Sequence, residues 1–180
     1  MTIVLIPPHS LKTDRLLLRP TRVADADRAF EIQTDWEVTR MLSSASFPPD
    51  QREIERWFAD HPREWEAGHA YRFAVVLEEK MVGVVDIDGI GERAGTLGYW
   101  FDRAVWGHGY AFEAAHAVTR FAVGNACLLK LKAGHAHDNP ASGRILTKLG
   151  FSRLDIVQLF SRPRNEYISQ CRYVQTLHRT

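Results

Sequence analysis

The hydrophobic pattern changes at Tyr71, and this change limits the possible folds more than any other feature of the chain. Before it, apolar residues recur at helical spacing within residues 26–33 and again within 54–58. After it come three strand-like runs separated only by short turns, at residues 71–77, 81–87 and 95–101. Strands that follow one another so closely pair as antiparallel neighbours. The centre of the chain is therefore predicted to be an antiparallel meander.

The segment before Tyr71 predicts one strand and two helices. Residues 15–19 form a short buried strand that Pro20 stops, and either Thr21 or Asp25 can cap the first helix. A break at residues 43–49 precedes the second helix. Two helices in succession after one strand indicate a lid-like insertion.

Helices and strands alternate after the meander. Residues 111–122 place small and apolar side chains on one helical face, and residues 129–133 alternate as a strand. Asn139 is a good N-cap for a second helix, Gly150 ends that helix, and residues 166–174 form a closing strand. The fold class is therefore α/β, with a mixed, mostly antiparallel central sheet and helices on both faces.

Length and charge set the domain count and exclude several classes of protein. The 180 residues contain no repeat or linker, so we expect one domain at residues 11–180 after a flexible tail at residues 1–10. A net charge of +1 provides no excess of positive charge to bind a nucleic-acid backbone. No apolar stretch approaches the roughly 18 residues of a membrane span. Cys127 and Cys171 match no zinc spacing and are expected to be free thiols. The expected location is the cytoplasm.

Residues 106–111, Trp-Gly-His-Gly-Tyr-Ala, lie between the third strand of the meander and the helix that follows it. A helix start presents unpaired N–H groups and the positive end of the helix dipole, and glycines let an anion approach those donors closely. The run lacks the last glycine of the dinucleotide fingerprint and the Lys-Ser/Thr ending of a P-loop. It therefore predicts either an anion site of another kind or a plain tight turn.

Three blocks of sequence resemble the GNAT superfamily of N-acetyltransferases, in particular its RimJ/RimL branch of ribosomal-protein N-acetyltransferases. They are residues 13–20, residues 97–114 with the glycine run, and residues 138–151, which begin Asp-Asn-Pro-Ala-Ser-Gly-Arg. The blocks occur in the family's order, and the likeness covers residues 11–175. The resemblance implies a GNAT-like acetyl-CoA-binding fold and an acetyl-CoA-dependent enzyme that needs no metal.

The resemblance also implies which residues bind acetyl-CoA. The glycine run matches the family's pyrophosphate loop, whose backbone amides hold the coenzyme diphosphate. Trp100 and Phe101 fall where the family's fourth strand splays from its fifth, and the backbone there bonds the pantetheine arm and the thioester carbonyl. Asn139 and Ser142 match positions near the coenzyme sulfur. The implied cofactor-binding residues are Trp100, Phe101, Gly107, His108, Gly109, Tyr110, Ala111, Asn139 and Ser142.

Acyl transfer needs a deprotonated amine, donors for the developing oxyanion and a proton for the leaving thiolate. Ser142 is the candidate proton donor, although a serine in the first turn of a helix can also serve only to cap the backbone. Many relatives carry a glutamate where this chain has Thr96, so a strong local base is missing there. Asp86 and Asp88 share one face of a strand, and either can relay a proton through water or be a solvated surface group. Asp86 joins Ser142 as a candidate catalytic residue.

The absence of a glutamate at Thr96 affects which amine can accept the acetyl group. At pH 7, about one-sixth of an α-amino group of pKa about 7.7 is free base, against about one part in 2,500 for a lysine. An enzyme short of bases therefore favours a protein or peptide N-terminus, or an amine-bearing small molecule of low pKa. The predicted function is N-acetylation of a primary amine by direct attack in a ternary complex, carried out by a monomer or homodimer. The alternatives are a coenzyme-A-binding sensor without turnover and a nucleotide-phosphate enzyme.

Two further features have alternative interpretations. His135 and His137 lie two apart on a strand beside Asp138, a spacing that can hold a metal ion. Since acetyl transfer needs no metal, no metal site is predicted. Glu113 lies in the first turn of a helix, where the dipole favours a carboxylate, and structural support is its expected role.

Overall fold

A computed structural model describes residues 9–178; it contains the predicted elements and adds two strands and a short helix. The helices are α1 (Ala26–Gln33), α2 (Trp36–Thr39), α3 (Gln51–Glu66), α4 (Tyr110–Gly124) and α5 (Pro140–Lys148), with short 3-10 turns at Val23–Asp25 and Arg103–Val105. The strands are β1 (Leu11–Lys12), β2 (Leu17–Pro20), β3 (Tyr71–Leu77), β4 (Lys80–Gly91), β5 (Ala94–Phe101), β6 (Lys130–Ala136), β7 (Ser152–Ser161) and β8 (Glu166–Thr176). The tail predicted at residues 1–10 lies outside the described residues, apart from His9 and Ser10.

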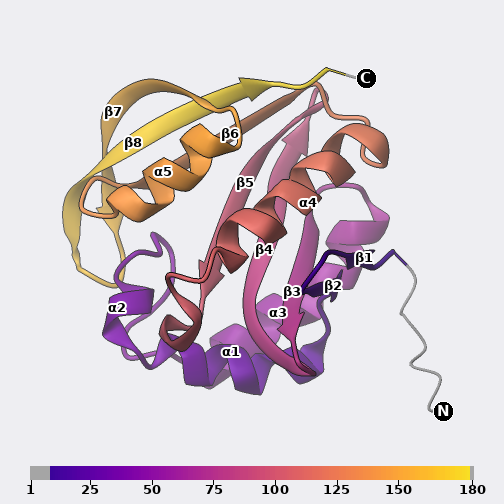
Figure 1. Ribbon diagram of the computed structural model, residues 1–180. Coiled ribbons are helices and arrows are strands. Elements are labelled where there is room, and N and C mark those ends of the chain that lie inside the picture. The colour runs from indigo at the N-terminus through magenta and orange to yellow at the C-terminus, as the bar shows by residue number, and fades with distance from the viewer. Residues whose placement is uncertain (1–8, 179–180) are drawn as a thin grey trace, which may run out of the picture.

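The described strands form one sheet in the order β1-β2-β3-β4-β5-β6-β8-β7 (Figure 1). β3, β4 and β5 pair antiparallel in succession, which confirms the predicted meander. β5 and β6 pair in parallel, because α4 carries the chain back along the sheet between them. The neighbouring β6 and β8 return to antiparallel pairing. The sheet is therefore mixed and mostly antiparallel, as the sequence predicts.

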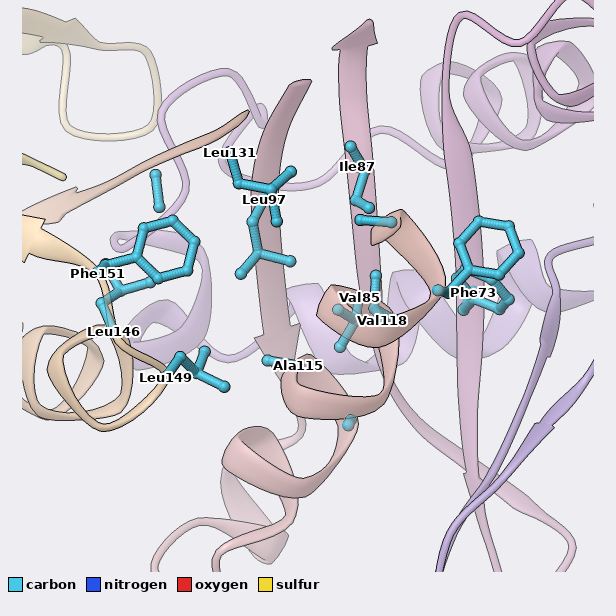
Figure 2. Packing of buried hydrophobic residues seen from close by; sticks show 14 of the residues in the cluster. Phe73, Val85, Ile87, Leu97, Ala115, Val118, Leu131, Leu146, Leu149 and Phe151 are labelled. Carbon is cyan, nitrogen blue, oxygen red and sulfur yellow. The ribbon is translucent and has the colours of Figure 1, made fainter. Parts of the chain in front are cut away.

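Helices cover both faces of this sheet, because successive residues of its central strands point to opposite faces. Val85 of β4 is buried on the face that α4 covers, and Figure 2 shows it beside Val118 of α4. Its neighbour Val84 is buried on the other face with Ala29 of α1 and Phe58 of α3. The predicted fold class is confirmed. No helix within residues 9–178 is long and apolar enough to cross a membrane.

Three elements escape prediction: the two-residue strand β1, the edge strand β7 and the short helix α2. β7 is an edge strand that pairs with β8, and its Leu154, Ile156 and Phe160 are exposed. Since neither face of the strand is fully buried, its sequence lacks the clean alternation that burial imposes. The helix α2 has four residues, which is too short to show a helical period.

Of the two residues predicted to cap the first helix, Thr21 does not cap it, and Asp25 occupies the N-cap position without a side-chain cap. Thr21 is occupied elsewhere, because its hydroxyl bonds Nδ1 of His61 at 2.7 Å. Asp25 does hold the N-cap position of α1, but its side chain caps no helical N–H group. Its carboxylate instead accepts two hydrogen bonds from the Arg19 guanidinium, at 2.6 and 2.8 Å, and one from the Arg22 N–H at 2.9 Å. A bidentate guanidinium is a stronger partner for a buried carboxylate than a backbone amide.

The helix α5 begins and ends as predicted. Asn139 accepts a hydrogen bond from the Ser142 N–H at 3.3 Å, Pro140 is the first helical residue, and Gly150 follows the end of the helix with φ +93°. Gly143 lets α5 approach the sheet closely. A Cβ at this position would lie 2.7 Å from Nε2 of His135.

We expect Gly143→Ala to lower the free energy of unfolding by about 1–3 kcal/mol, because the added methyl group forces the buried His135 ring out of its hydrogen-bonded position. Gly124→Ala is the matched control, since nothing lies within 4 Å of its added Cβ. Alanine is the better helix former by about 1 kcal/mol, so the control should be neutral or stabilised. Urea denaturation measures both variants. Equal stabilisation of the two would contradict the close packing of α5 on β6.

Candidate active site

The loop before α4 has the conformation that its glycines allow. Gly107 and Gly109 both have φ +82°, in the left-handed region that side chains other than glycine rarely adopt. Gly109 is the N-cap of α4, and no side chain caps this helix start. The N–H groups of its first turn therefore point out of the helix toward an open loop, where nothing lies within 4 Å of a Cβ built on Gly107. This arrangement fits an anion such as a diphosphate.

Trp106 fixes the loop to the end of β5. Its indole Nε1 donates a hydrogen bond to the Phe101 carbonyl at 3.0 Å. His108 folds back within the loop, where its Nδ1 lies 2.9 Å from the Trp106 carbonyl oxygen and its ring stacks on Tyr110. The tryptophan therefore ties the glycine loop to the strand that leads into it.

β5 and β6 part after a short stretch of pairing. They pair only from Ala94 to Thr96 and from Lys130 to Lys132, after which β6 pairs with β8 and β5 with β4. The edge of β5 that faces β6 therefore has no strand partner from Leu97 to Phe101 among the described residues. Backbone N–H and C=O groups along this edge are available to a ligand lying in the gap. Phe101 lies on this edge, where its N–H faces the gap while Trp106 occupies its carbonyl oxygen, and its ring is buried in the core. Trp100 pairs with Val84 of β4, and its carbonyl oxygen lies toward Gly83 on that side.

Ser142 and Tyr99 meet on the α4 side of this gap. The Ser142 Oγ lies 2.8 Å from the Tyr99 hydroxyl, and both side chains are largely buried. It is the backbone N–H of Ser142, not its hydroxyl, that takes part in the Asn139 cap. Burial raises the pKa of Tyr99 to about 12, so Tyr99 stays protonated and able to donate. The sequence analysis did not single out Tyr99, because nothing in a strand tyrosine indicates that a helix 43 residues later supplies its partner.

Asp86 lies on the opposite face of the sheet, next to the same gap. It pairs across the strands with Gly98, and its Oδ1 lies 2.7 Å from where a Gly98 Cβ would stand. The glycine thus leaves room for the carboxylate over β5. Arg72 holds the other oxygen, Oδ2, at 2.5 Å. Asp86 is therefore not a solvated surface group: its side chain is 13% exposed, against 48% for Asp88.

Three carboxylates share the guanidinium of Arg72. Glu64 of α3 accepts from its Nε at 2.9 Å, Asp86 accepts from Nη1, and Asp88 lies 3.6 Å away. Trp57 of α3 covers the guanidinium at 5.2 Å. Burial raises the pKa of Asp86 to about 7 despite the opposing charge of Arg72, and the charge of Asp88 adds to the rise. One positive charge for three acids leaves a proton on the most buried of them near neutral pH.

The remaining candidates have structural partners. The carboxylate of Glu113 bonds Thr13 and Arg15, in line with its expected supporting role. His135 is buried, with Nδ1 at 2.8 Å from the Ala136 carbonyl oxygen and Nε2 at 3.3 Å from the Tyr173 hydroxyl. Within residues 9–178, no three His, Cys, Asp or Glu side chains come together as a metal-binding group.

A glycine loop at a helix start, beside a parallel strand pair that parts, defines a coenzyme-A-dependent acyltransferase fold. The chain belongs to the GNAT acetyltransferase family, whose domain matches residues 15–152. It is thus an acetyl-CoA-dependent N-acetyltransferase, as the sequence predicts. The roles of individual site residues stay predictions.

Relatives and solved structures agree with this family. The chain is 26% identical over 166 residues to the uncharacterised N-acetyltransferase p20 of Bacillus licheniformis, covering 89% of this chain and 92% of that protein. It is 25% identical over 157 residues to the probable N-acetyltransferase YjcK of Bacillus subtilis, covering 82% and 86%. RimL, the ribosomal L7/L12 alpha-N-protein acetyltransferase, in complex with coenzyme A, has a similar fold, with a TM-score of 0.82 at 18% identity over 96% of this chain and 97% of RimL. The acetyltransferase MccE, in complex with acetyl-CoA and AMP, also has a similar fold, with a TM-score of 0.83 at 15% identity over 96% of this chain and 98% of MccE.

The raised pKa of Asp86 predicts a pH-dependent stability. Between its ordinary value of 3.8 and about 7, the folded chain binds more protons than the unfolded chain. The stabilisation from this group therefore declines as the pH rises above about 4 and is lost once the pH passes about 7. When the pH is raised from about 5 to about 8, the free energy of unfolding should fall less for Asp86→Asn than for the wild type, as measured by urea denaturation. Asp60→Asn, at an exposed position, is the control and should follow the wild type. Parallel curves for all three proteins would contradict the raised pKa.

Proposed function

We propose that the enzyme transfers the acetyl group of acetyl-CoA to the α-amino group at a protein or peptide N-terminus, by direct attack in a ternary complex. One observation carries the proposal. Gly98 and Tyr99 are successive residues of β5 at the gap between β5 and β6, and they point to opposite faces of the sheet. Gly98 has the Asp86 carboxylate over it, and Tyr99 meets Ser142. A thioester lying in the gap would have a base on one side and a proton donor on the other.

The coenzyme would lie along the α4 face. The backbone amides of the loop around Gly107, His108 and Gly109 and the first turn of α4, with Tyr110 and Ala111, would hold the diphosphate. The free edge of β5 next to Trp100, where the Phe101 N–H faces the gap, would bond the pantetheine arm and the thioester carbonyl oxygen. Asn139 and Ser142, at the start of α5, would lie near the sulfur.

The reaction then divides between the two faces. Asp86 Oδ1, which makes no hydrogen bond within the described residues, takes a proton from the acceptor ammonium group while Arg72 holds Oδ2. The free amine attacks the thioester carbon, and backbone N–H groups of β5 stabilise the negative charge on its oxygen. As the carbon–sulfur bond breaks, the Ser142 hydroxyl gives a proton to the leaving sulfur, and the Tyr99 hydroxyl at 2.8 Å passes its proton to Ser142. The attacking nitrogen loses its second proton as the amide forms, and a proton from solvent restores Tyr99, so that the products are the amide and the free thiol.

The pKa of the base favours an α-amine over a lysine. A carboxylate of pKa about 7 accepts a proton from an α-ammonium group of pKa about 7.7 at a cost of about 1 kcal/mol. The same transfer from a lysine of pKa about 10.4 costs about 4–5 kcal/mol. Two neighbours in fold support this acceptor class by their names: RimL, an alpha-N-protein acetyltransferase, and the ribosomal-protein-S5-alanine acetyltransferase of Vibrio fischeri, with a TM-score of 0.81 at 18% identity over 93% of this chain and 96% of that chain.

Thiol release from acetyl-CoA tests the acceptor. We expect a lysine-free peptide with a free N-terminus to exceed a lysine peptide with a blocked N-terminus by about 10-fold or more in kcat/KM at pH about 7. Asp86→Asn should lower the rate with the first peptide by about 100-fold and remove the rise in rate near pH 7. A faster rate with blocked lysine peptides would overturn the acceptor assignment. Binding of acetyl-CoA, seen as a raised melting temperature, without thiol release for any amine would favour the sensor.

Kinetics of Ser142→Ala test the proton donor. The variant should lose about 10- to 1,000-fold in kcat with little change in the KM for acetyl-CoA, because the hydroxyl acts only as the sulfur leaves. Tyr99→Phe should show a smaller loss of the same kind, since it removes only the group that restores the proton. Thr147→Ala removes another hydroxyl from α5 and is the control. Normal kcat for Ser142→Ala with reduced stability would assign the serine a structural role instead.

A further inference from the structure

The turn between β1 and β2 reaches across to the glycine loop before α4. Glu113, in the first turn of α4, accepts hydrogen bonds from the Thr13 hydroxyl at 2.6 Å and from the Arg15 backbone N–H at 2.9 Å. Its other oxygen accepts from Nε of Arg15 at 2.7 Å. These contacts join residues about 100 positions apart in sequence, so the anion-binding loop is assembled from two distant segments.

Arg15 also bonds the loop backbone directly. Its Nη1 donates a hydrogen bond to the carbonyl oxygen of His108 at 2.9 Å, and its guanidinium lies over the Tyr110 ring at 4.4 Å. The next residue, Gly109, is the N-cap of α4, and a Cβ built on it would stand 3.5 Å from Nη2 of Arg15. The guanidinium therefore contacts His108 and Tyr110 and occupies the space beside Gly109, at the turn from loop to helix.

The carbonyl of His108 and the N–H of Gly109 belong to one peptide group. In a trans peptide these two groups point in opposite directions. By holding the carbonyl oxygen on its own side, Arg15 therefore aims the Gly109 N–H away from itself and out of the loop. Gly109 lacks the Cβ that would otherwise restrict this peptide, so the sequence alone leaves it free to turn over.

We propose that Arg15 is a positioning residue for the coenzyme: it locks the His108–Gly109 peptide so that the Gly109 N–H faces the diphosphate. Glu113 supplies the fixed point, because its carboxylate orients the guanidinium through Nε and Nη2. It also neutralises Arg15, so the effect of the arginine is orientation and not attraction of phosphate. The inference rests on the proposed function of the loop as the diphosphate site.

Two acetyl donors separate this role from general damage to the fold. Acetyl-CoA carries the diphosphate, whereas S-acetylpantetheine has the same thioester and pantetheine arm without it. We expect Arg15→Gln to raise the KM for acetyl-CoA by about 10-fold or more with kcat within about twofold of the wild type. The kcat/KM for S-acetylpantetheine should stay unchanged. Arg15→Lys keeps one donor for the His108 carbonyl but loses the paired Nε and Nη2 contacts with Glu113. Its KM for acetyl-CoA should therefore lie between those of the wild type and Arg15→Gln.

Arg63→Gln removes an exposed arginine from an ion pair on α3 and is the matched control. If Arg15→Gln behaves like this control with acetyl-CoA while the wild type strongly prefers acetyl-CoA, the positioning role is overturned and the loop assignment stands. If the wild type uses both donors equally well, the loop does not hold the diphosphate, and both proposals fall. Equal losses with the two donors in Arg15→Gln and Arg15→Lys would show a structural role and also overturn the inference.

Discussion

The parting of β5 from β6 is the constraint on which the rest of the site depends. A sheet normally pairs its strands along their whole length, because unpaired backbone groups are costly when they are buried. Here the parallel pair holds for three residues on each strand, and β6 then continues with β8 alone. The unpaired edge of β5 is left to a ligand, and α4 and α5 flank it on one face (Figure 1).

Strand geometry distributes the chemistry around this edge. Because side chains alternate, one residue step along β5 takes the chain from the Asp86 side to the Ser142 side. Each side is supported by a different element: α3 supplies Glu64 and Trp57 to the guanidinium that holds Asp86, and α5 supplies Ser142 to Tyr99. Asp86 and Tyr99 are thus kept apart by the sheet itself, in surroundings that raise both of their pKa values by burial.

Local signals predicted the elements well where burial or a cap leaves a mark in the sequence. Asn139, Pro140 and Gly150 delimit α5 as expected, because each acts through the backbone of its immediate neighbours. Thr21 does not cap α1, and Asp25 holds the N-cap position without a side-chain cap, because distant or stronger partners, His61 and Arg19, bind their side chains. β7 was missed because an exposed edge strand carries little periodic signal. The sequence leaves the environment of Asp86 open, since the local sequence around a strand carboxylate is the same whether the side chain faces water or a buried guanidinium.

The sequence by itself determined the meander, the glycine loop at a helix start and the family, because these rest on periodicity, on glycines beside a helix and on motifs within short windows. Only the tertiary structure decided what surrounds each reactive group. Arg72 comes to Asp86 from the neighbouring strand, Tyr99 to Ser142 from 43 residues away, and Arg15 to the loop from the far end of the chain. Burial and charge set a pKa through space, and neighbours in space are fixed by strand order and helix packing, which no local pattern of residues records.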